Sequence, residues 1–142
     1  ELLSFRVGAQ EYCVDIMSVR EIRGWTRPTP IPRSAHWVRG VINLRGPVLP
    51  IIDLARRLTI AVEDASERNV IIVVKIRHQT VGLLVDAVSD ILAVPEGEMR
   101  PPPDMSTDDE DSFVSALTIV DNRMLRILDL NTVLPESDRN AA

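Results

Sequence analysis

Short runs of apolar residues recur along the chain, and each is bounded by glycine, proline or polar turn residues. Runs of this length with such boundaries are typical of β-strands rather than helices. The pattern predicts a first strand pair at residues 2–7 and 11–15, and a later, strongly apolar pair at 70–76 and 80–85. Residues 16–22 fit either a helical turn or a bent strand, because their apolar positions are spaced by three.

The clearest hairpin signal lies within residues 40–54, which read GVINLRGPVLPIIDL. Two apolar strands, at 41–44 and 47–52, are joined by Arg45 and Gly46. Gly46 can adopt the positive φ that a tight two-residue connection requires. Arg45 is therefore expected at the tip of a hairpin with buried arms. There it fits either a solvated turn residue or a cation placed to bind a partner.

A two-residue connection fixes the register of this hairpin. It places Ile42 opposite Leu49 and Asn43 opposite Val48, which makes one face of the strand pair almost wholly apolar. Asp53 closes the second strand. The pairing is a direct prediction, since a shift by one residue would turn every apolar side chain to the other face.

The same pattern returns without a gap at residues 116–130, which read ALTIVDNRMLRILDL. The connection Arg45-Gly46 aligns with Asp121-Asn122, and Asp and Asn also tolerate a left-handed backbone. A second hairpin with the same kind of connection is therefore expected near the C-terminal end of the sequence.

A looser repeat precedes each hairpin, in the segments 14–22 and 85–91. Both segments begin with Val-Asp and continue with alternating apolar and polar residues. The sequence therefore predicts one unit used twice, folded as two small β modules that pack together. Residues 59–69, which are polar and acidic, are expected to connect these modules.

Other segments are expected outside the strands. Residues 25–32 contain three prolines, so this stretch should be extended and should not lie inside a sheet. Ser34 is expected to cap a short helix over residues 35–39, which Gly40 would end. The remaining segments predict a helical turn at 54–58, an extended stretch at 86–94, a long exposed loop at 95–112 and a terminal turn at 131–134.

Length and composition limit the possible classes of protein. A chain of 142 residues is expected to form one domain, spanning residues 1–142. The net charge of -5, from 16 basic and 21 acidic residues, disfavours a nucleic-acid partner, because that partner requires a basic face. The longest apolar run, residues 70–74, is too short to span a bilayer, so no direct membrane insertion is expected. One cysteine excludes an internal disulfide framework and fits a reducing compartment.

Residues that carry enzyme chemistry are few. His36 and His78 have no partner at the spacing of a known motif, and Cys13 fits a small buried thiol in a strand. No phosphate-binding glycine loop, zinc spacing or nucleophile elbow occurs. Asp15 and Asp86 occupy equivalent strand ends, which favours a structural role for both. We therefore expect a protein that is not an enzyme and that has no metal site and no cofactor.

Many ordered segments of the chain resemble the CheW family, whose members are adaptors of bacterial chemotaxis. The resemblance extends over residues 3–134, and GVINLRG at 40–46 is its most specific part. The other matching segments are FRVG at 5–8 with Tyr12, VDI at 14–16, VREIRG at 19–24, PIIDL at 50–54, VGLLVD at 81–86, RPPP at 100–103 and DNRML at 121–125. Cys13, where glycine is usual, and Met105, where an aromatic is common, depart from the family pattern.

The resemblance implies an all-β fold of two SH3-like five-stranded β-barrel subdomains packed together, with a few short helices. It also implies a scaffold that joins the cytoplasmic tips of chemoreceptors to the histidine kinase CheA, whose regulatory domain has the same fold. Such a scaffold is cytoplasmic and is associated with membrane-bound receptor arrays.

The resemblance further implies two sets of binding residues. In the family, the helical hairpin of the receptor lies along the groove between the modules, and the kinase docks at the ends of the barrels. The positions that match the receptor site are Val19, Glu21, Arg45 and Ile91. The positions that match the kinase site are Arg100, Asp104 and Met105.

Other readings share part of this argument. The chain could be the CheW-like module of a larger adaptor of the CheV type, of the kinase itself, or of a pilus-motility system. A nucleic-acid binder built on a small β-barrel is the alternative from a different class. It would need clustered basic residues, whereas this chain has a single lysine, Lys75, within a strand expected to be buried.

Overall fold

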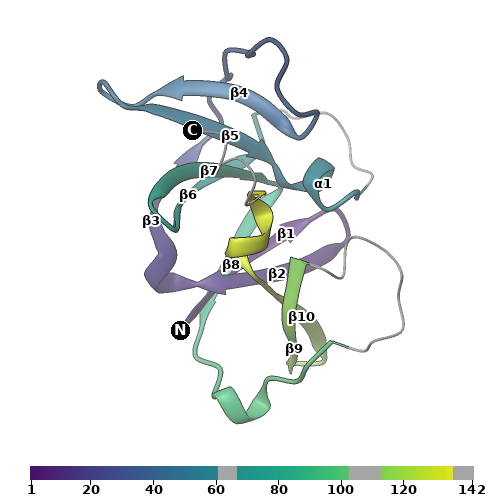
Figure 1. Cartoon of the computed structure of the whole chain (residues 1–142). Coiled ribbons are helices and arrows are strands. Elements are labelled where there is room, and N and C mark those ends of the chain that lie inside the picture. Colours follow the sequence, from purple (N-terminus) through teal and green to yellow (C-terminus); the bar gives the residue numbers. More distant parts are fainter. Residues whose placement is uncertain (61–66, 103–112, 136–142) are drawn as a thin grey trace.

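A computed structural model gives the fold of the chain and describes residues 1–60, 67–102 and 113–135 (Figure 1). Strands dominate the described residues, and the helical elements are all short. The strands are β1 (Leu2–Val7), β2 (Gln10–Asp15), β3 (Val19–Gly24), β4 (Val38–Asn43), β5 (Val48–Asp53), β6 (Val70–Ile76), β7 (Gln79–Val85), β8 (Ala87–Leu92), β9 (Val114–Val120) and β10 (Arg123–Leu128). The helical elements are the 3-10 turns η1 (Ile16–Ser18) and η2 (Glu96–Glu98) and the one-turn helices α1 (Leu54–Arg57) and α2 (Leu130–Val133).

The strands form two five-stranded sheets. One has the order β8-β1-β2-β10-β9 and is here called barrel A, and the other has the order β3-β6-β7-β5-β4 and is called barrel B. Neighbours within each hairpin are antiparallel, whereas β10 runs parallel to β2 and β5 runs parallel to β7. The two sheets therefore have the same internal topology, as the sequence repeat predicted.

Each sheet closes through one isolated bridge. In barrel B, Thr29 and Val41 exchange two backbone hydrogen bonds, of 2.8 and 2.9 Å. In barrel A, Arg100 and Leu117 do the same at 2.8 and 2.7 Å. The repeat aligns Val41 with Leu117, so both barrels close at the same position of the unit. The predicted all-β fold of two small barrels is confirmed.

Gly40 is required at the closure of barrel B. Its φ is +141°, and a Cβ atom built on it would lie 2.2 Å from the carbonyl oxygen of Thr29. Residues with a side chain rarely adopt this backbone conformation, and the backbone of Thr29 could not approach so closely. This glycine therefore does not end a helix, as the sequence suggested, but admits the strand that closes the barrel.

The two copies of the repeated unit exchange strands, which the sequence did not predict. β3 follows β2 in the chain but pairs with β6 of barrel B, and β8 follows β7 but pairs with β1 of barrel A. The expected connection between modules at 59–69 is wrong, because the last strand before it, β5, and the first strand after it, β6, both belong to barrel B. A repeat shows which units recur, but it does not show with which copy a third strand pairs.

The apolar residues of the strands divide between three clusters. Alternation along β6 illustrates the rule: Ile71 and Val73 point into barrel B, whereas Ile72 and Val74 point to the space between the barrels. Strands that are buried on both faces explain the nearly continuous apolar runs in the sequence. The exception within β6 is Lys75, whose side chain is exposed.

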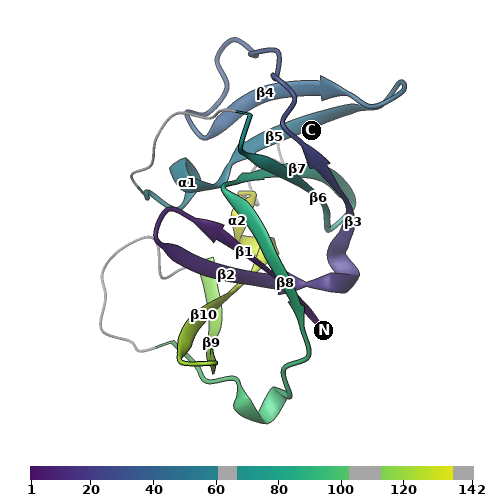
Figure 2. The same ribbon diagram turned by 180° about the vertical axis from the view of Figure 1, so that it is seen from behind.

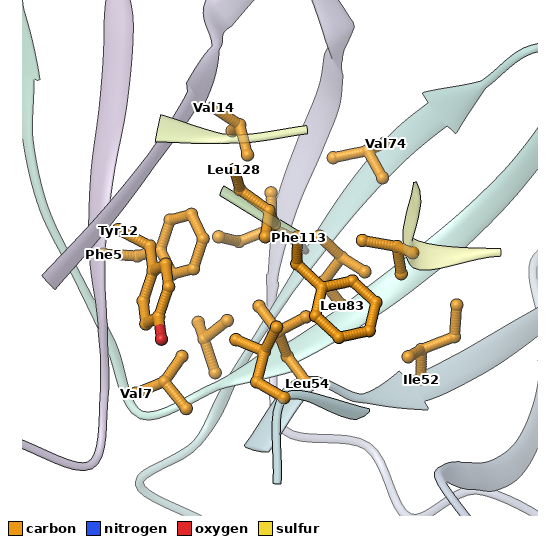
Figure 3. Close-up of a cluster of buried hydrophobic side chains, with 14 of the residues drawn as sticks. Phe5, Val7, Tyr12, Val14, Ile52, Leu54, Val74, Leu83, Phe113 and Leu128 are labelled. Atoms are coloured by element: carbon orange, nitrogen blue, oxygen red, sulfur yellow. The ribbon is translucent and has the colours of Figure 1, made fainter. Parts of the chain in front are cut away.

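The largest cluster lies between the barrels and joins them (Figure 3). Its aromatic members include Phe5 and Tyr12, whose rings are stacked with centroids 6.1 Å apart. The interior of barrel A contains Leu2, Cys13, Leu125 and Ile127, and the interior of barrel B contains Ile42, Leu49, Ile51, Ile71, Val73 and Leu84. Cys13 is thus the buried thiol that was predicted.

The helical elements confirm two predictions and contradict one. Asp53 caps α1 by accepting a hydrogen bond from the Arg56 amide at 3.2 Å, and the equivalent Asp129 caps α2. The helix expected at 35–39 is wrong, because β4 begins within it. Ser34 donates its hydroxyl to the Ile31 carbonyl at 2.9 Å instead of accepting a backbone amide, so no cap forms.

Two further segments contain more structure than the sequence suggested. Residues 16–22 combine both alternatives that were left open, since the turn η1 is followed directly by β3. The loop expected at 95–112 begins with η2 and then pairs with β9 through Arg100. The rest of that loop lies outside the described residues.

Candidate functional site

A depression of about 360 Å³ lies between β3 and the tip of the β4–β5 hairpin. It is lined by Glu21, Arg23, Asn43, Leu44 and Arg45. β3 and β4 are the two outer strands of the barrel B sheet order, so the sheet must curl on itself to bring them together. The barrel closure described above thus creates this surface.

The hairpin tip holds Arg45 in a fixed backbone conformation. Arg45 and Gly46 both have positive φ, of 53° and 111°. The Asn43 side chain accepts a hydrogen bond from the Gly46 amide at 3.0 Å, and the Leu44 amide donates to the Pro47 carbonyl at 2.8 Å. The observed register, with Ile42 opposite Leu49 and Asn43 opposite Val48, confirms the prediction.

Charge at the depression is net positive. Arg23 forms an ion pair with Glu21 at 3.3 Å, and both side chains are substantially exposed. The Nε atom of Arg23 is buried and has no hydrogen-bond partner, and Arg45 makes no ion pair with another described residue. Two guanidinium groups against one carboxylate leave donors that can form forked hydrogen bonds with carboxylate or carbonyl oxygens.

The structure places the four predicted receptor-site residues on two barrels. Glu21 and Arg45 line the same depression, and Val19 begins the strand that carries Glu21. Ile91 lies on β8, the outer strand of barrel A, with 60% of its surface exposed. Figure 2 shows β3 and β8 on the same side of the molecule. Val19 is half-buried and packs against the cluster between the barrels.

Sequence reasoning missed one residue that lines the depression, Arg23, and one exposed residue outside its lining, Met17. Arg23 lies two positions after Glu21 in the same strand, so the period of two was a usable signal that both share a face. Met17 is 78% exposed and lies in η1, where the chain crosses from barrel A to barrel B. No pattern in the sequence indicated its exposure.

A second depression, of about 520 Å³, lies at the β9–β10 hairpin of barrel A. Arg100, predicted from the kinase site, lines it together with Ile119 and Met124. These two apolar residues face each other across the hairpin and are 67% and 49% exposed. Sequence reasoning missed both. Asp104 and Met105, the other predicted kinase-site residues, lie outside the described residues.

The polar residues that could suggest chemistry have structural partners. Asp15 accepts the Met17 amide at 2.9 Å, and Asp86 accepts the Gly8 amide at 2.8 Å, which confirms the structural role predicted for both. Burial raises the pKa of the Cys13 thiol to about 12, so the thiol is protonated at neutral pH.

The described parts of the chain contain neither a metal-binding cluster nor a membrane-spanning helix. Within residues 1–60, 67–102 and 113–135, no group of His, Cys, Asp and Glu side chains is arranged to hold a metal ion. Over the same ranges, no helix has the length and apolar character needed to cross a membrane.

Comparison with known proteins identifies the family. The model of the CheW-like domain matches residues 1–138. The chemotaxis protein CheW of Rhizobium meliloti (strain 1021) is 50% identical over 142 residues, which cover 100% of this chain and 92% of that protein. The chemotaxis protein CheW of Bacillus subtilis (strain 168) is 33% identical over 142 residues, covering 100% of this chain and 91% of that protein.

A solved structure agrees with the sequence matches. The crystal structure of the scaffolding protein TtCheW from Thermoanaerobacter tengcongensis superposes with a TM-score of 0.86 at 34% sequence identity. The superposition covers 93% of this chain and 90% of that one. Sequence and overall shape therefore agree that the chain belongs to the CheW family of chemotaxis scaffolding proteins.

Proposed function

We propose that this protein joins chemoreceptor cytoplasmic tips to the histidine kinase CheA, binding the kinase through its regulatory domain. The observation that carries the proposal is the position of β3 and β8, the strands of Glu21 and Ile91, on the same side of the molecule (Figure 2). Arg45 is held rigidly at the depression that Glu21 also lines, and Ile91 is exposed on β8. A helical hairpin that presents both apolar and polar side chains is a partner that fits this combination.

Within this proposal, residues 1–142 act as a single domain made of two barrel subdomains. The strand order and the cluster between the barrels support it, because each sheet combines strands from the first copy of the unit, β1–β5, with strands from the second copy, β6–β10. Such a domain presents its surfaces in one fixed arrangement. It catalyses no reaction and uses no cofactor.

The receptor site consists of Val19, Glu21, Arg45 and Ile91. Val19 and Ile91 offer apolar contact, and Ile91 has the larger exposed surface of the two. Arg45 fixes the register of the receptor helices by forked hydrogen bonds, because its backbone is already held by the turn. Glu21 and its partner Arg23 add a second polar contact beside it.

The kinase site lies at the barrel A end, at Arg100, with Asp104 and Met105 in the segment that follows. The exposed pair Ile119 and Met124 supports this placement, since apolar residues in a depression are typical anchors of protein interfaces. Receptor and kinase then bind at separate surfaces. Simultaneous binding raises the effective concentration of each for the other in cytoplasmic arrays beneath the receptors.

Charge reversal at the hairpin tip tests the receptor site. Arg45→Glu should weaken binding to receptor tips by about tenfold or more, because a like charge would then face the partner's acceptors. The free energy of unfolding should change by less than about 0.5 kcal/mol, since the side chain is exposed. The measurement is co-sedimentation with receptor-containing membranes.

The matched control is Arg27→Glu, an exposed arginine of the segment after β3 that makes no ion pair with a described residue. It makes the same change in net charge at a residue that does not line the depression. Receptor binding should persist in this control. Co-sedimentation of Arg45→Glu at the level of the unmodified protein would show that the groove assignment is wrong.

A further inference from the structure

The two one-turn helices end in different ways, although they occupy equivalent positions of the repeat. After α1, the Thr59 amide donates to the Arg56 carbonyl at 3.2 Å, and the Ile60 amide donates to the Ala55 carbonyl at 2.7 Å. Thr59 has a φ of 58°. This is the Schellman arrangement, in which the residues after a helix satisfy its last carbonyl groups. α1 therefore caps itself.

α2 cannot end in this way. The repeat that aligns Gly40 with Ala116 also aligns Thr59 with Pro135. Proline has no amide hydrogen to donate, and its ring holds φ near −65°, so the left-handed conformation is closed to it. Leu134 accordingly leaves the helix with extended backbone, at φ −100° and ψ 130°. The carbonyl groups at the end of α2 must find donors elsewhere.

Two arginines from segments next to barrel B strands supply those donors. Arg57, the last residue of α1, donates to the Val133 carbonyl at 2.6 Å and to the Thr132 carbonyl at 3.3 Å. Arg77, in the β6–β7 turn, donates to two further carbonyl groups of the same helix end. These belong to Asn131, at 2.9 Å, and Leu134, at 3.3 Å. Each of the four carbonyl groups from 131 to 134 accepts one of these bonds.

Arg57 is also held between aromatic rings from the two halves of the molecule. Its guanidinium carbon lies 4.7 Å from the centroid of the Trp37 ring and 4.8 Å from that of Phe113. The same repeat aligns Trp37 with Phe113, and their carbonyl groups accept equivalent bonds from Asp53 and Asp129. Arg57 thus lies where the two copies of the unit meet. It contacts the equivalent aromatic residue of each copy.

These hydrogen bonds make the contact between the two barrels depend on their relative orientation. The cluster between the barrels is stabilised by burial, which depends on area and hardly on orientation. Hydrogen bonds to four named carbonyl groups, in contrast, are satisfied at one geometry. We propose that Arg57 and Arg77 form an arginine clamp that fixes the angle between the two barrels. They are positioning residues: they touch no partner, but they set how β3 and β8 face each other.

Distance measurement between the barrels tests the clamp directly. Spin labels are placed at Lys75→Cys on β6 and Asp90→Cys on β8, two exposed strand positions in different barrels. Cys13 is buried and protonated, so it stays unlabelled. The unmodified clamp should give one narrow distance distribution by double electron–electron resonance. The double variant Arg57→Lys with Arg77→Lys should give a broader or shifted one.

Lysine keeps the charge and the apolar stem of arginine, so the fold should survive. It lacks the forked donors and the planar group that lies between the rings, so the clamp should be lost. The matched control is Arg27→Lys, which should leave the distribution unchanged. Adding Pro135→Gly to the double variant should leave the distribution broad, because this change restores only a cap within α2 and no contact between the barrels. Glycine at this position can adopt positive φ and donate to the Thr132 carbonyl, as Thr59 does in the other copy.

An unchanged distribution in the double lysine variant would overturn the clamp. Narrowing of the distribution on adding Pro135→Gly would also overturn it, because the broadening would then come from an uncapped α2 and not from the lost bonds between the barrels. Receptor-tip binding provides a separate measurement, which rests on the proposed function. The double variant should bind receptor tips about tenfold more weakly, an effect of about 1.4 kcal/mol. A broadened distribution with unchanged receptor binding would leave the clamp standing and contradict a receptor site that spans both barrels.

Discussion

Substitution of glycines by alanine gives a graded test of barrel closure. Gly40 combines positive φ with a forbidden contact, because its Cβ would lie 2.2 Å from the Thr29 carbonyl oxygen. Gly46 has positive φ, of 111°, but open space around it, and Gly24 has neither constraint. The three variants Gly40→Ala, Gly46→Ala and Gly24→Ala therefore separate backbone strain from steric exclusion.

The expected costs follow from the contacts. Strain at a positive φ costs about 1–3 kcal/mol, which should be the whole effect at Gly46. At Gly40 the same strain is joined by loss of the two hydrogen bonds between Thr29 and Val41, at about 0.5–1.5 kcal/mol each. The sum is roughly 2–6 kcal/mol, a large part of the ~5–15 kcal/mol that stabilises a typical domain. Gly24→Ala should change stability by less than about 0.5 kcal/mol.

Urea unfolding of the three variants measures these differences, and the midpoint of thermal unfolding should fall by about 10 °C for Gly40→Ala. Hydrogen exchange then locates the damage. The Thr29 and Val41 amides should lose protection in Gly40→Ala and keep it in Gly46→Ala. Equal stability of Gly40→Ala and Gly24→Ala, or full protection of those two amides in Gly40→Ala, would refute the argument that this glycine permits closure.

Two further predictions concern the barrel A end and the buried thiol. Met124→Asp should weaken binding of the kinase regulatory domain by about 30-fold, which is the loss typical of an interface anchor. The control Ser115→Asp, at an exposed position of β9, should bind normally. Isothermal titration calorimetry measures both affinities. Equal affinities would exclude Met124 from the interface. Burial raises the pKa of the Cys13 thiol from 9.0 to about 12, so the unfolded chain loses this proton first. The resulting stabilisation is complete below pH 9.0 and is lost as the pH rises towards 12. The free energy of unfolding of the unmodified protein should therefore fall over this pH range. The Cys13→Ala variant should lack this contribution to the fall. Parallel curves for the two proteins would contradict the assignment.

The local pattern of the sequence predicted the secondary structure of both hairpins. The register of Ile42 with Leu49 follows from the length of the connection, and a loop of two residues leaves little choice. The caps at Asp53 and Asp129 were not singled out as caps, although the repeat placed them at equivalent strand ends. The helix expected at 35–39 does not form, because β4 begins at Val38 and pairs with the strand that closes the barrel. These pairings stabilise the strand more than a weak helix cap would stabilise the helix.

The candidate site was predictable in part for a similar reason. Arg45 stands out in the sequence because it is the one charged residue within 41–52 and because the hairpin tip is defined by neighbouring residues. Arg23 was within reach of the same reasoning, as it shares a strand face with Glu21. Ile119 and Met124 were not, because their alternation is the same as that of buried strand residues and only the end of the barrel leaves them exposed.

The sequence by itself determined that one β unit occurs twice, where its turns fall and which residues are apolar, because these properties depend on neighbours in the chain. The tertiary structure decided that β1 and β2 pair with β8 and β10 of the second copy, that Thr29 and Arg100 close the barrels, and that two arginines hold the end of α2. Each of these contacts joins segments that are distant in the chain. Their free energy depends on packing that exists only once both copies have folded together.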